Sequence, residues 1–231
     1  MRALILPIGG SASRMQGIPK FLLPINSNLT LIENHIQSAL NAGYDQVYVV
    51  SQELYVPILE KQLAKFPNKV QINTLTKPTA TMCETLITSQ IETSKYSRIT
   101  VGLPDTVYLG SDALEVYRNL ISRKEPVILS LFKIRKDQIG KLGQLQLDGN
   151  NRVTDMRDKD PECSWPWIWG IADFDSKFFA EIREAEAHVG ISIQRWMGEG
   201  IPVSGVKNDA EYYDCGTFDE YAKYIKASSS E

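Results

Sequence analysis

The stretch Ala3-Leu4-Ile5-Leu6-Pro7-Ile8-Gly9-Gly10, residues 3–10, decides the fold class of this chain. A short, continuous apolar run that ends in two glycines is typical of a buried strand followed by a tight loop. The run is too short to span a membrane, and it is not followed by a signal-peptide cleavage pattern. We therefore expect a strand over residues 3–8 that brings a glycine loop to one edge of a sheet.

Apolar runs of strand length alternate with segments of helical period over roughly the first 133 residues. Further strands are expected at residues 46–51, 70–75, 98–103 and 126–132. Helices are expected at residues 30–42, 56–66, 82–93 and 114–121. This order predicts a Rossmann-like α/β fold, in which helices cover both faces of a mostly parallel mixed sheet in three αβα layers. Such sheets bind ligands at the carboxyl ends of their strands.

The rest of the chain has a different pattern. Residues 144–148 and 152–156 flank a Gly-Asn-Asn turn and are expected to pair antiparallel. We expect a strand over residues 165–172 and an amphipathic helix over residues 175–188, with Gly190 after its end. A further strand starts in residues 200–203, and residues 217–226 form the last helix. We find no domain break, so residues 1–231 are expected to form one domain.

The composition of the chain limits which binding partners and which cellular location can be expected. The chain has 231 residues, of which 43% are hydrophobic and 23% charged, and its net charge is −3. This balance argues against a nucleic-acid partner, and no segment suggests a membrane partner. The three cysteines are widely spaced and odd in number, so they suggest neither a disulfide framework nor a metal site. A cytoplasmic location is expected.

The glycine loop carries the strongest chemical signal. Glycines after a strand let backbone N–H groups approach phosphate oxygens, and nearby cations add positive charge. The loop lacks the GKS or GKT of a P-loop and the acidic residue of a dinucleotide fingerprint. The alternative is a tight turn with two solvated basic residues. The residues expected to bind a nucleotide here are Gly9, Gly10, Ser11, Ala12, Ser13, Arg14 and Lys20.

The loop GGSASRM and the following IPKFLLPI resemble the signature of the sugar nucleotidyltransferases, also called nucleotide-sugar pyrophosphorylases. Their pattern is close to GGxGTRL and PKPLLPI, and Ala12 stands where the family usually has glycine. Leu103-Pro104-Asp105 is similar to the family segment with the first metal-binding aspartate. Tyr213-Asp214-Cys215-Gly216-Thr217 is similar to the late D-x-G-T segment, which supplies the second. The resemblance covers nearly the whole chain.

The resemblance also implies an acceptor site. Residues 157–161, Arg-Asp-Lys-Asp-Pro, resemble the E-K-P segment whose lysine binds the sugar phosphate, which points to Lys159 with Asp158 beside it. Gly143 matches a glycine whose backbone approaches the sugar, although an ordinary strand glycine is nearly as good an interpretation. We expect the acceptor side to be built mainly from about residues 134–215.

Two carboxylates fit the chemistry of Mg²⁺, which takes one or two protein carboxylates together with phosphates and water. The resemblance assigns this role to Asp105 and Asp214. Each has a structural alternative, because aspartate is common in turns and at helix caps. Mg²⁺ is thus the expected cofactor.

The sequence says less about which residues recognise the base of the nucleotide and the sugar. Pro78 and Thr81 fall where the family reads the base, although Thr81 is equally suited to cap a helix. Trp165, Trp167 and Trp169 recur with period two. A buried aromatic cluster is preferred over a sugar-binding or dimer surface, with Trp169 placed nearest the sugar. Neither His35 nor His188 shows a catalytic pattern.

The resemblance implies Mg²⁺-dependent transfer of a nucleotidyl group from an NTP, dTTP or UTP, to a sugar 1-phosphate, with release of pyrophosphate. The residues expected to drive it are Arg14, Lys20, Asp105, Lys159 and Asp214. Two alternatives remain: a cytidylyltransferase with another phosphate acceptor, and a non-catalytic relative that binds a nucleotide sugar. A homo-oligomer is left open. The chain ends one helix after the D-x-G-T segment, so we expect no further C-terminal domain.

Overall fold

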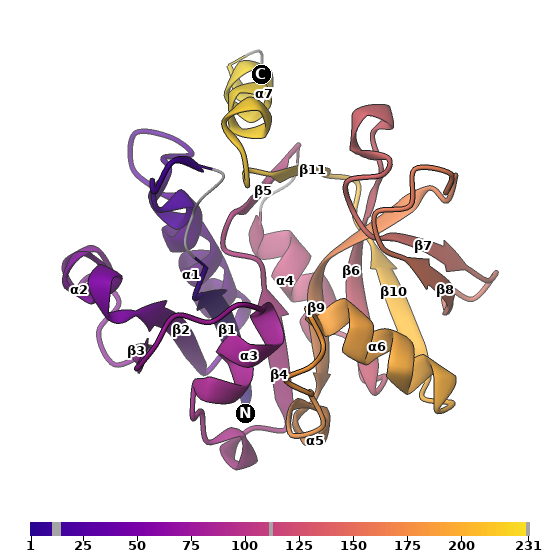
Figure 1. Ribbon diagram of the computed structural model, residues 1–231, viewed down its shortest axis with the longest axis horizontal. Coiled ribbons are helices and arrows are strands. Elements are labelled where there is room, and N and C mark those ends of the chain that lie inside the picture. Colours follow the sequence, from indigo (N-terminus) through magenta and orange to yellow (C-terminus); the bar gives the residue numbers. More distant parts are fainter. Residues whose placement is uncertain (11–14, 111–112, 230–231) are drawn as a thin grey trace.

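A computed structural model describes residues 1–10, 15–110 and 113–229 of the chain (Figure 1). Its main element is a nine-stranded sheet in which seven strands follow the order β10-β6-β9-β4-β1-β2-β3, with β7 and β8 attached beside β9. The strands of this sheet are β1 (Arg2–Ile8), β2 (Gln46–Gln52), β3 (Val70–Leu75), β4 (Arg98–Gly102), β6 (Val127–Lys133), β7 (Gln144–Leu147), β8 (Val153–Arg157), β9 (Trp167–Asp175) and β10 (Val203–Lys207).

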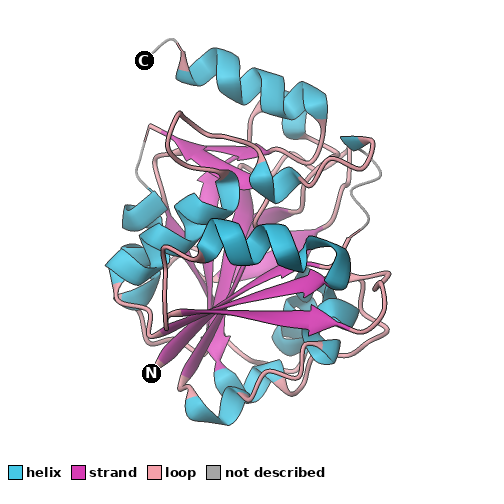
Figure 2. Cartoon of the chain, turned by 90° about the vertical axis from the view of Figure 1, so that its left-hand side faces the viewer, coloured by secondary structure: helices cyan, strands magenta, loops and turns pink. Residues whose placement is uncertain are grey.

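The sheet is mixed but mostly parallel, as predicted. β1 pairs parallel with both β2 and β4, β2 pairs parallel with β3, and β6 pairs parallel with β10. Only β9 interrupts this path, because it runs antiparallel between β4 and β6. The β7–β8 hairpin is antiparallel, as its turn residues predicted. The strands fan out in a twisted sheet (Figure 2).

Helices cover both faces of the sheet, which confirms the αβα arrangement. They are α1 (Leu31–Ala42), α2 (Val56–Leu63), α3 (Met82–Thr88), α4 (Ala113–Ile121), α5 (Ser176–Phe179), α6 (Val189–Gly198) and α7 (Phe218–Ser228). Alternate residues of β1 explain the two layers. Ile5 belongs to the apolar cluster beneath α3, α5 and α6, whereas Leu4 and Leu6 belong to the cluster beneath α1, α2 and α4.

The first helix shows how local sequence sets an element boundary. The Glu33 carboxylate accepts a hydrogen bond of 2.8 Å from the backbone N–H of Thr30, which satisfies a donor at the helix start. Gly43 ends α1 in the left-handed region, with φ of 105°. Both ends lie where the sequence predicted them. α2 and α3 are shorter than expected, ending at Leu63 and Thr88.

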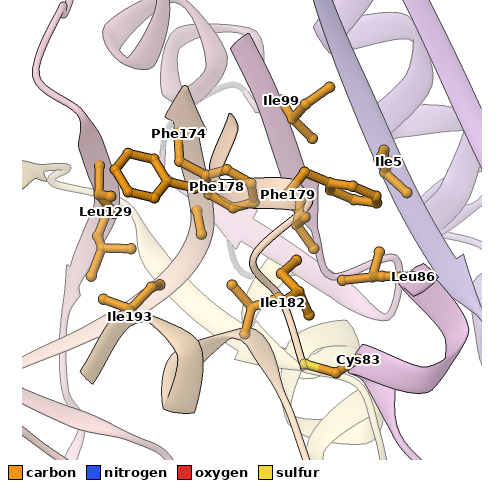
Figure 3. Packing of buried hydrophobic residues seen from close by; sticks show 14 of the residues in the cluster. Ile5, Cys83, Leu86, Ile99, Leu129, Phe174, Phe178, Phe179, Ile182 and Ile193 are labelled. Carbon is orange, nitrogen blue, oxygen red and sulfur yellow. The ribbon is translucent and has the colours of Figure 1, made fainter. Parts of the chain in front are cut away.

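The predicted helix over residues 175–188 is wrong. Only α5 is helical there, and Gly190, expected beyond a helix end, lies in the first turn of α6. The apolar residues that suggested one long helix do reach the core: Phe178, Phe179 and Ile182 pack from α5 and the turn after it (Figure 3). Their spacing therefore reflects burial of a short helix and a turn.

Glu186 shows why the chain turns instead of continuing as a helix. Its carboxylate accepts hydrogen bonds from the backbone N–H of Arg183 at 3.2 Å and from the Arg195 guanidinium at 2.8 Å. The Ser192 hydroxyl also donates to it. Burial opposes this charge, but these donors hold the pKa of Glu186 below its usual value. The carboxylate therefore ties the turn to α6.

The expectation of a buried tryptophan cluster is met only in part, because Trp167 and Trp169 pack against the core but are not fully buried. Trp165, Trp167 and Trp169 are all only half-buried, and Trp165 lies outside β9. The fully buried indole is that of Trp196 in α6, which contacts Phe174 and Phe178. Trp169 thus keeps part of its ring available at the surface. Across the described residues, no helix is both long and apolar enough to cross a membrane.

Candidate active site

A second, two-stranded sheet extends the edge where the parallel strands end. β5 (Thr106–Leu109) pairs antiparallel with β11 (Glu211–Asp214), and α7 lies above this pair in Figure 1. Neither strand was predicted from the sequence, because each is only four residues long. Their β-branched and aromatic residues, in TVYL and EYYD, were the available signal.

This small sheet brings the two predicted metal-binding aspartates together. Asp214 is the partner of Thr106 in the β5–β11 register, so it lies across from the residue next to Asp105. The backbone N–H of Cys215 donates to the carbonyl of Asp105 at 2.8 Å, which joins the two segments. The backbone segments that hold these two residues, 109 positions apart in sequence, therefore lie side by side.

Lys20 lies at the same point. Its Nζ is 3.6 Å from Asp105 Oδ2, and the two side chains are 14% and 28% exposed. A Cβ placed on Gly216 would lie 2.7 Å from Asp214 Oδ1 and 3.6 Å from Lys20 Nζ. Gly216 thus has no room for a side chain between the carboxylate and the ammonium group. Lys20 therefore lies near both Asp105 and the Asp214–Gly216 turn.

The structural alternatives for the aspartates can be compared with this geometry. Asp214 Oδ1 accepts the backbone N–H of Gly216 at 2.9 Å, so Asp214 does form an Asx turn. It does not cap α7, because that position belongs to Thr217, whose hydroxyl accepts from Glu220 N–H at 3.3 Å. An Asx turn leaves other lone pairs of the carboxylate available, so it is compatible with metal binding.

The donor set at this point suits a hard cation. Asp105 and Asp214 offer only carboxylate oxygens, which Mg²⁺ prefers. The neighbouring thiol of Cys215 is buried, and burial together with both aspartates raises its pKa well above the usual value. It therefore stays neutral and is a poor ligand. Among the described residues no group of three or more His, Cys, Asp or Glu side chains could hold a metal, so phosphate and water oxygens would have to complete the shell.

The glycine loop begins at the end of β1, next to this cluster. Gly9 is buried, and a Cβ there would lie 2.5 Å from Thr79 Oγ1 and 2.6 Å from Thr85 Oγ1, so only glycine fits. The side-chain amide of Gln52 donates to the Gly9 carbonyl. Sequence reasoning missed these three supports because they come from other elements. Gly10 is exposed and lines a pocket with Lys20 and Asp105, and its contact with a nucleotide stays a prediction.

Four predicted loop residues lie outside the described part of the chain: Ser11, Ala12, Ser13 and Arg14. Of the two residues expected near the base, Pro78 is exposed on the loop before α3. Thr81 caps α3, and its hydroxyl accepts the backbone N–H of Glu84 at 3.0 Å. This bears out the capping interpretation of Thr81, and its contact with a base stays a prediction.

The predicted acceptor residues divide between two neighbouring spaces. Lys159 lines a cleft together with Asp214 and Gly216. Asp158, Gly143 and Trp169 line an adjoining pocket. Lys159 has φ of 51°, a left-handed conformation that turns the chain between these two spaces.

His35 supports the site without facing it. Its Nε2–H donates to the Thr106 carbonyl at 2.9 Å, and its Nδ1 accepts from the Tyr117 hydroxyl at 2.8 Å. Burial lowers the pKa of His35 to about 4, so the ring is neutral near pH 7. This agrees with the expectation that His35 is not catalytic. It anchors the first residue of β5, directly after Asp105.

The fold and this edge together define a class of protein. Solved structures with a similar fold include a UDP-glucose pyrophosphorylase complexed with UDP-glucose, at a TM-score of 0.80 and 15% identity, covering 100% of this chain and 99% of that one. Another is a putative glucose-1-phosphate thymidylyltransferase from Bacillus anthracis in complex with a sucrose, at a TM-score of 0.78 and 17% identity, covering 99% and 95%. At this level of identity the likeness establishes the fold.

The sequence itself establishes the family. Residues 3–144 match the MobA-like NTP transferase domain, and this match spans more than half of the chain. The chain therefore belongs to the family of MobA-like NTP transferase domains and is a nucleotidyltransferase, as the sequence resemblance implied. A comparison with curated protein sequences finds no match.

Proposed function

We propose that this nucleotidyltransferase joins the nucleotidyl group of dTTP or UTP to a sugar 1-phosphate and releases pyrophosphate. The observation that carries the proposal is the position of Lys20, near Asp105 and near the Asp214–Gly216 turn, with Lys159 lining a cleft with Asp214 and Gly216. This arrangement offers positive charge on both sides of a pair of carboxylates. It suits two phosphate-bearing substrates that meet at one point.

The nucleotide side is built around the end of β1. Backbone N–H groups of Gly9 and Gly10 would approach the phosphates of the NTP, and Lys20 would neutralise charge on them. As pyrophosphate departs, negative charge grows on its oxygens, and Lys20 would stabilise it. Arg14 is proposed to share this role. Asp105 holds Lys20 at 3.6 Å and so keeps the ammonium group at the loop.

The acceptor side is proposed to lie mainly within about residues 134–215. Lys159 would hold the acceptor phosphate against its repulsion from the triphosphate. Because that phosphate is already anionic, its oxygen can attack the α-phosphorus without a general base. The work left to the protein is then positioning and charge neutralisation, as in other phosphoryl-type transfers.

Asp105 and Asp214 are the residues that would hold Mg²⁺. When bound, this ion would neutralise charge on phosphate oxygens at the point where the two substrates meet. Without the ion the two aspartates would repel phosphate, because like charges repel. The cation and the two lysines together would let the two phosphates meet at this point.

Pyrophosphate release tests the proposal directly. Purified protein with Mg²⁺ would be assayed with dTTP, UTP, CTP, ATP and GTP, each crossed with several sugar 1-phosphates and with phosphocholine as a non-sugar acceptor. We expect release with a sugar 1-phosphate and dTTP or UTP. Release only with CTP and the non-sugar acceptor would favour the cytidylyltransferase alternative. Binding of a nucleotide sugar without release from any pair would favour a non-catalytic relative.

A further inference from the structure

The strand that carries Asp214 receives support from outside its own small sheet. β11 and β5 form a two-stranded sheet, and an isolated pair of strands is only marginally stable in water. Two side chains add to this pairing by donating to the backbone carbonyl of Tyr212: Arg135 Nη1 at 2.6 Å and Gln138 Nε2 at 2.8 Å. β11 is therefore fixed, two residues before Asp214, by groups from another part of the chain.

Both donors come from the segment that follows β6, at the short 3₁₀ helix η5 (Lys136–Gln138). Gln138 is only 2% exposed, and its Oε1 accepts the backbone N–H of Arg135 at 2.9 Å. The amide of Gln138 thus holds the start of η5 with its oxygen and β11 with its nitrogen. This contact fixes the two donors relative to each other.

The guanidinium group of Arg135 is held by three further groups. Its Cζ lies 4.2 Å from the ring centroid of Tyr213. Its Nη2 is 3.3 Å from Glu220 Oε2 at the start of α7, and its Nε is 3.3 Å from Asp137 Oδ1. Arginine can make all of these contacts at once, because its planar fork donates in several directions while its face stacks on an aromatic ring. A lysine ammonium group lacks both properties.

These contacts place Arg135 against both residues that precede Asp214. Arg135 donates to the carbonyl of Tyr212 and covers the ring of Tyr213. Asp214 is the next residue, and Mg²⁺ needs its oxygen ligands close to an octahedral arrangement. A displacement of β11 would move the Asp214 carboxylate relative to Asp105, and it would weaken the binding of a metal ion that both carboxylates hold.

We propose that Arg135 is a positioning residue that holds Asp214 in place for the metal ion, by fixing β11 to η5 and to the start of α7. The inference rests on the proposed function, because it requires Asp214 to be a metal ligand. Residues that orient metal ligands from outside the coordination shell contribute about 10- to 100-fold to metal affinity. Removal of Arg135 should therefore weaken the metal-dependent part of NTP binding and spare the rest.

Isothermal titration calorimetry of the full chain tests the inference without any turnover. Each protein is titrated with the NTP that wild type binds most tightly, once with Mg²⁺ and once with EDTA, and with no acceptor present. The ratio of the Kd in EDTA to the Kd in Mg²⁺ isolates the contribution of the metal. We expect this ratio to lie well above one for wild type and to fall in Asp214→Asn, which removes the charge of the proposed ligand.

Arg135→Ala should lower this ratio about tenfold and leave the Kd in EDTA close to the wild-type value. Arg135→Lys keeps the positive charge but lacks the fork, so it should lower the ratio less than Arg135→Ala does. Lys136→Ala removes the same charge from the neighbouring, exposed residue and should keep the wild-type ratio. Thermal unfolding shows whether each variant is folded. If Arg135→Ala does not fold, Arg135→Lys decides, and a wild-type ratio in that variant overturns the inference.

The outcomes separate this inference from the proposed function. A ratio near one in wild type, or an unchanged ratio in Asp214→Asn, would overturn the metal assignment and the inference together. If Asp214→Asn lowers the ratio but Arg135→Ala keeps it, only the inference is overturned. Equal increases of both Kd values in Arg135→Ala, or an equal fall of the ratio in Lys136→Ala, would overturn it too. If the ratios behave as expected but no acceptor releases pyrophosphate, the inference holds and the proposed transfer fails.

Discussion

The nucleotide side and the acceptor side of this protein differ in how directly sequence pattern determines structure. On the nucleotide side, β1 to β4 are parallel strands whose apolar residues are buried on both faces. On the acceptor side, a hairpin, short helices and turns surround one antiparallel strand, β9. There, the Glu186 carboxylate ties a turn to α6 through Arg183 and Arg195. Regular burial of apolar residues can be predicted from the sequence, whereas single polar contacts of this kind cannot.

The largest expected effect lies where the two sides meet. Asp105→Asn and Asp214→Asn each remove a carboxylate from the shared point, so we expect turnover to fall by about 10²-fold or more. The effect should appear with every NTP and acceptor pair, because both sides depend on this point. Steady-state pyrophosphate release measures it.

The control for these variants is a measurement of whether they still fold. Asparagine is close to aspartate in shape, so circular dichroism and thermal unfolding should stay close to wild type. Near-normal turnover in a folded Asp105→Asn or Asp214→Asn protein would contradict the metal assignment.

The next largest effect should distinguish the acceptor side from the nucleotide side in the kinetics. Lys159→Ala should raise the KM for the acceptor by about 10- to 100-fold and leave the KM for NTP nearly unchanged, because a charged hydrogen bond contributes about 1.5–3 kcal/mol. Lys20→Ala should also lower kcat, because Lys20 is proposed to stabilise the departing pyrophosphate. Initial rates with each substrate varied in turn would show the split. Indistinguishable kinetic defects in the two variants would contradict a division into two sides.

The elements that were predicted correctly from the sequence lie mainly on the nucleotide side. The β1 run and the Thr30–Glu33 pair with Gly43 predicted their elements, because burial and caps act locally. The pairing of β5 with β11 joins segments about a hundred residues apart, and nothing in either four-residue strand specifies its partner. The aspartates could therefore be proposed only through a resemblance, and the contact of Gln52 with the Gly9 carbonyl is created only by the fold.

Packing around the glycine loop gives a smaller effect. Gly9→Ala would bring a methyl group to 2.5–2.6 Å from the hydroxyl oxygens of Thr79 and Thr85, so these elements must shift. We expect a loss of about 1–3 kcal/mol in the free energy of unfolding and a raised KM for NTP. Denaturant unfolding and kinetics measure both. Gly10→Ala, at a position with open space, is the matched control, and equal destabilisation by both changes would contradict the packing argument.

The smallest effect concerns His35 and pH. Because its pKa is lowered to about 4 in the folded state, the unfolded chain binds a proton first as the pH falls below about 6.5. The stability that depends on neutral His35 is complete above pH 6.5 and is lost progressively down to about pH 4. Between pH 7 and pH 5 this amounts to about 2 kcal/mol. In His35→Gln the free energy of unfolding should depend less on pH by that amount, and an unchanged dependence would contradict the assignment.

The central claim is that an oxygen of the acceptor phosphate attacks the α-phosphorus of the NTP. The fate of ¹⁸O placed in the non-bridging phosphate oxygens of the sugar 1-phosphate tests it most directly. Mass spectrometry should find all of the label in the nucleotide sugar and none in the pyrophosphate. Label in the pyrophosphate, or formation of a nucleoside diphosphate with a sugar diphosphate, would contradict the account.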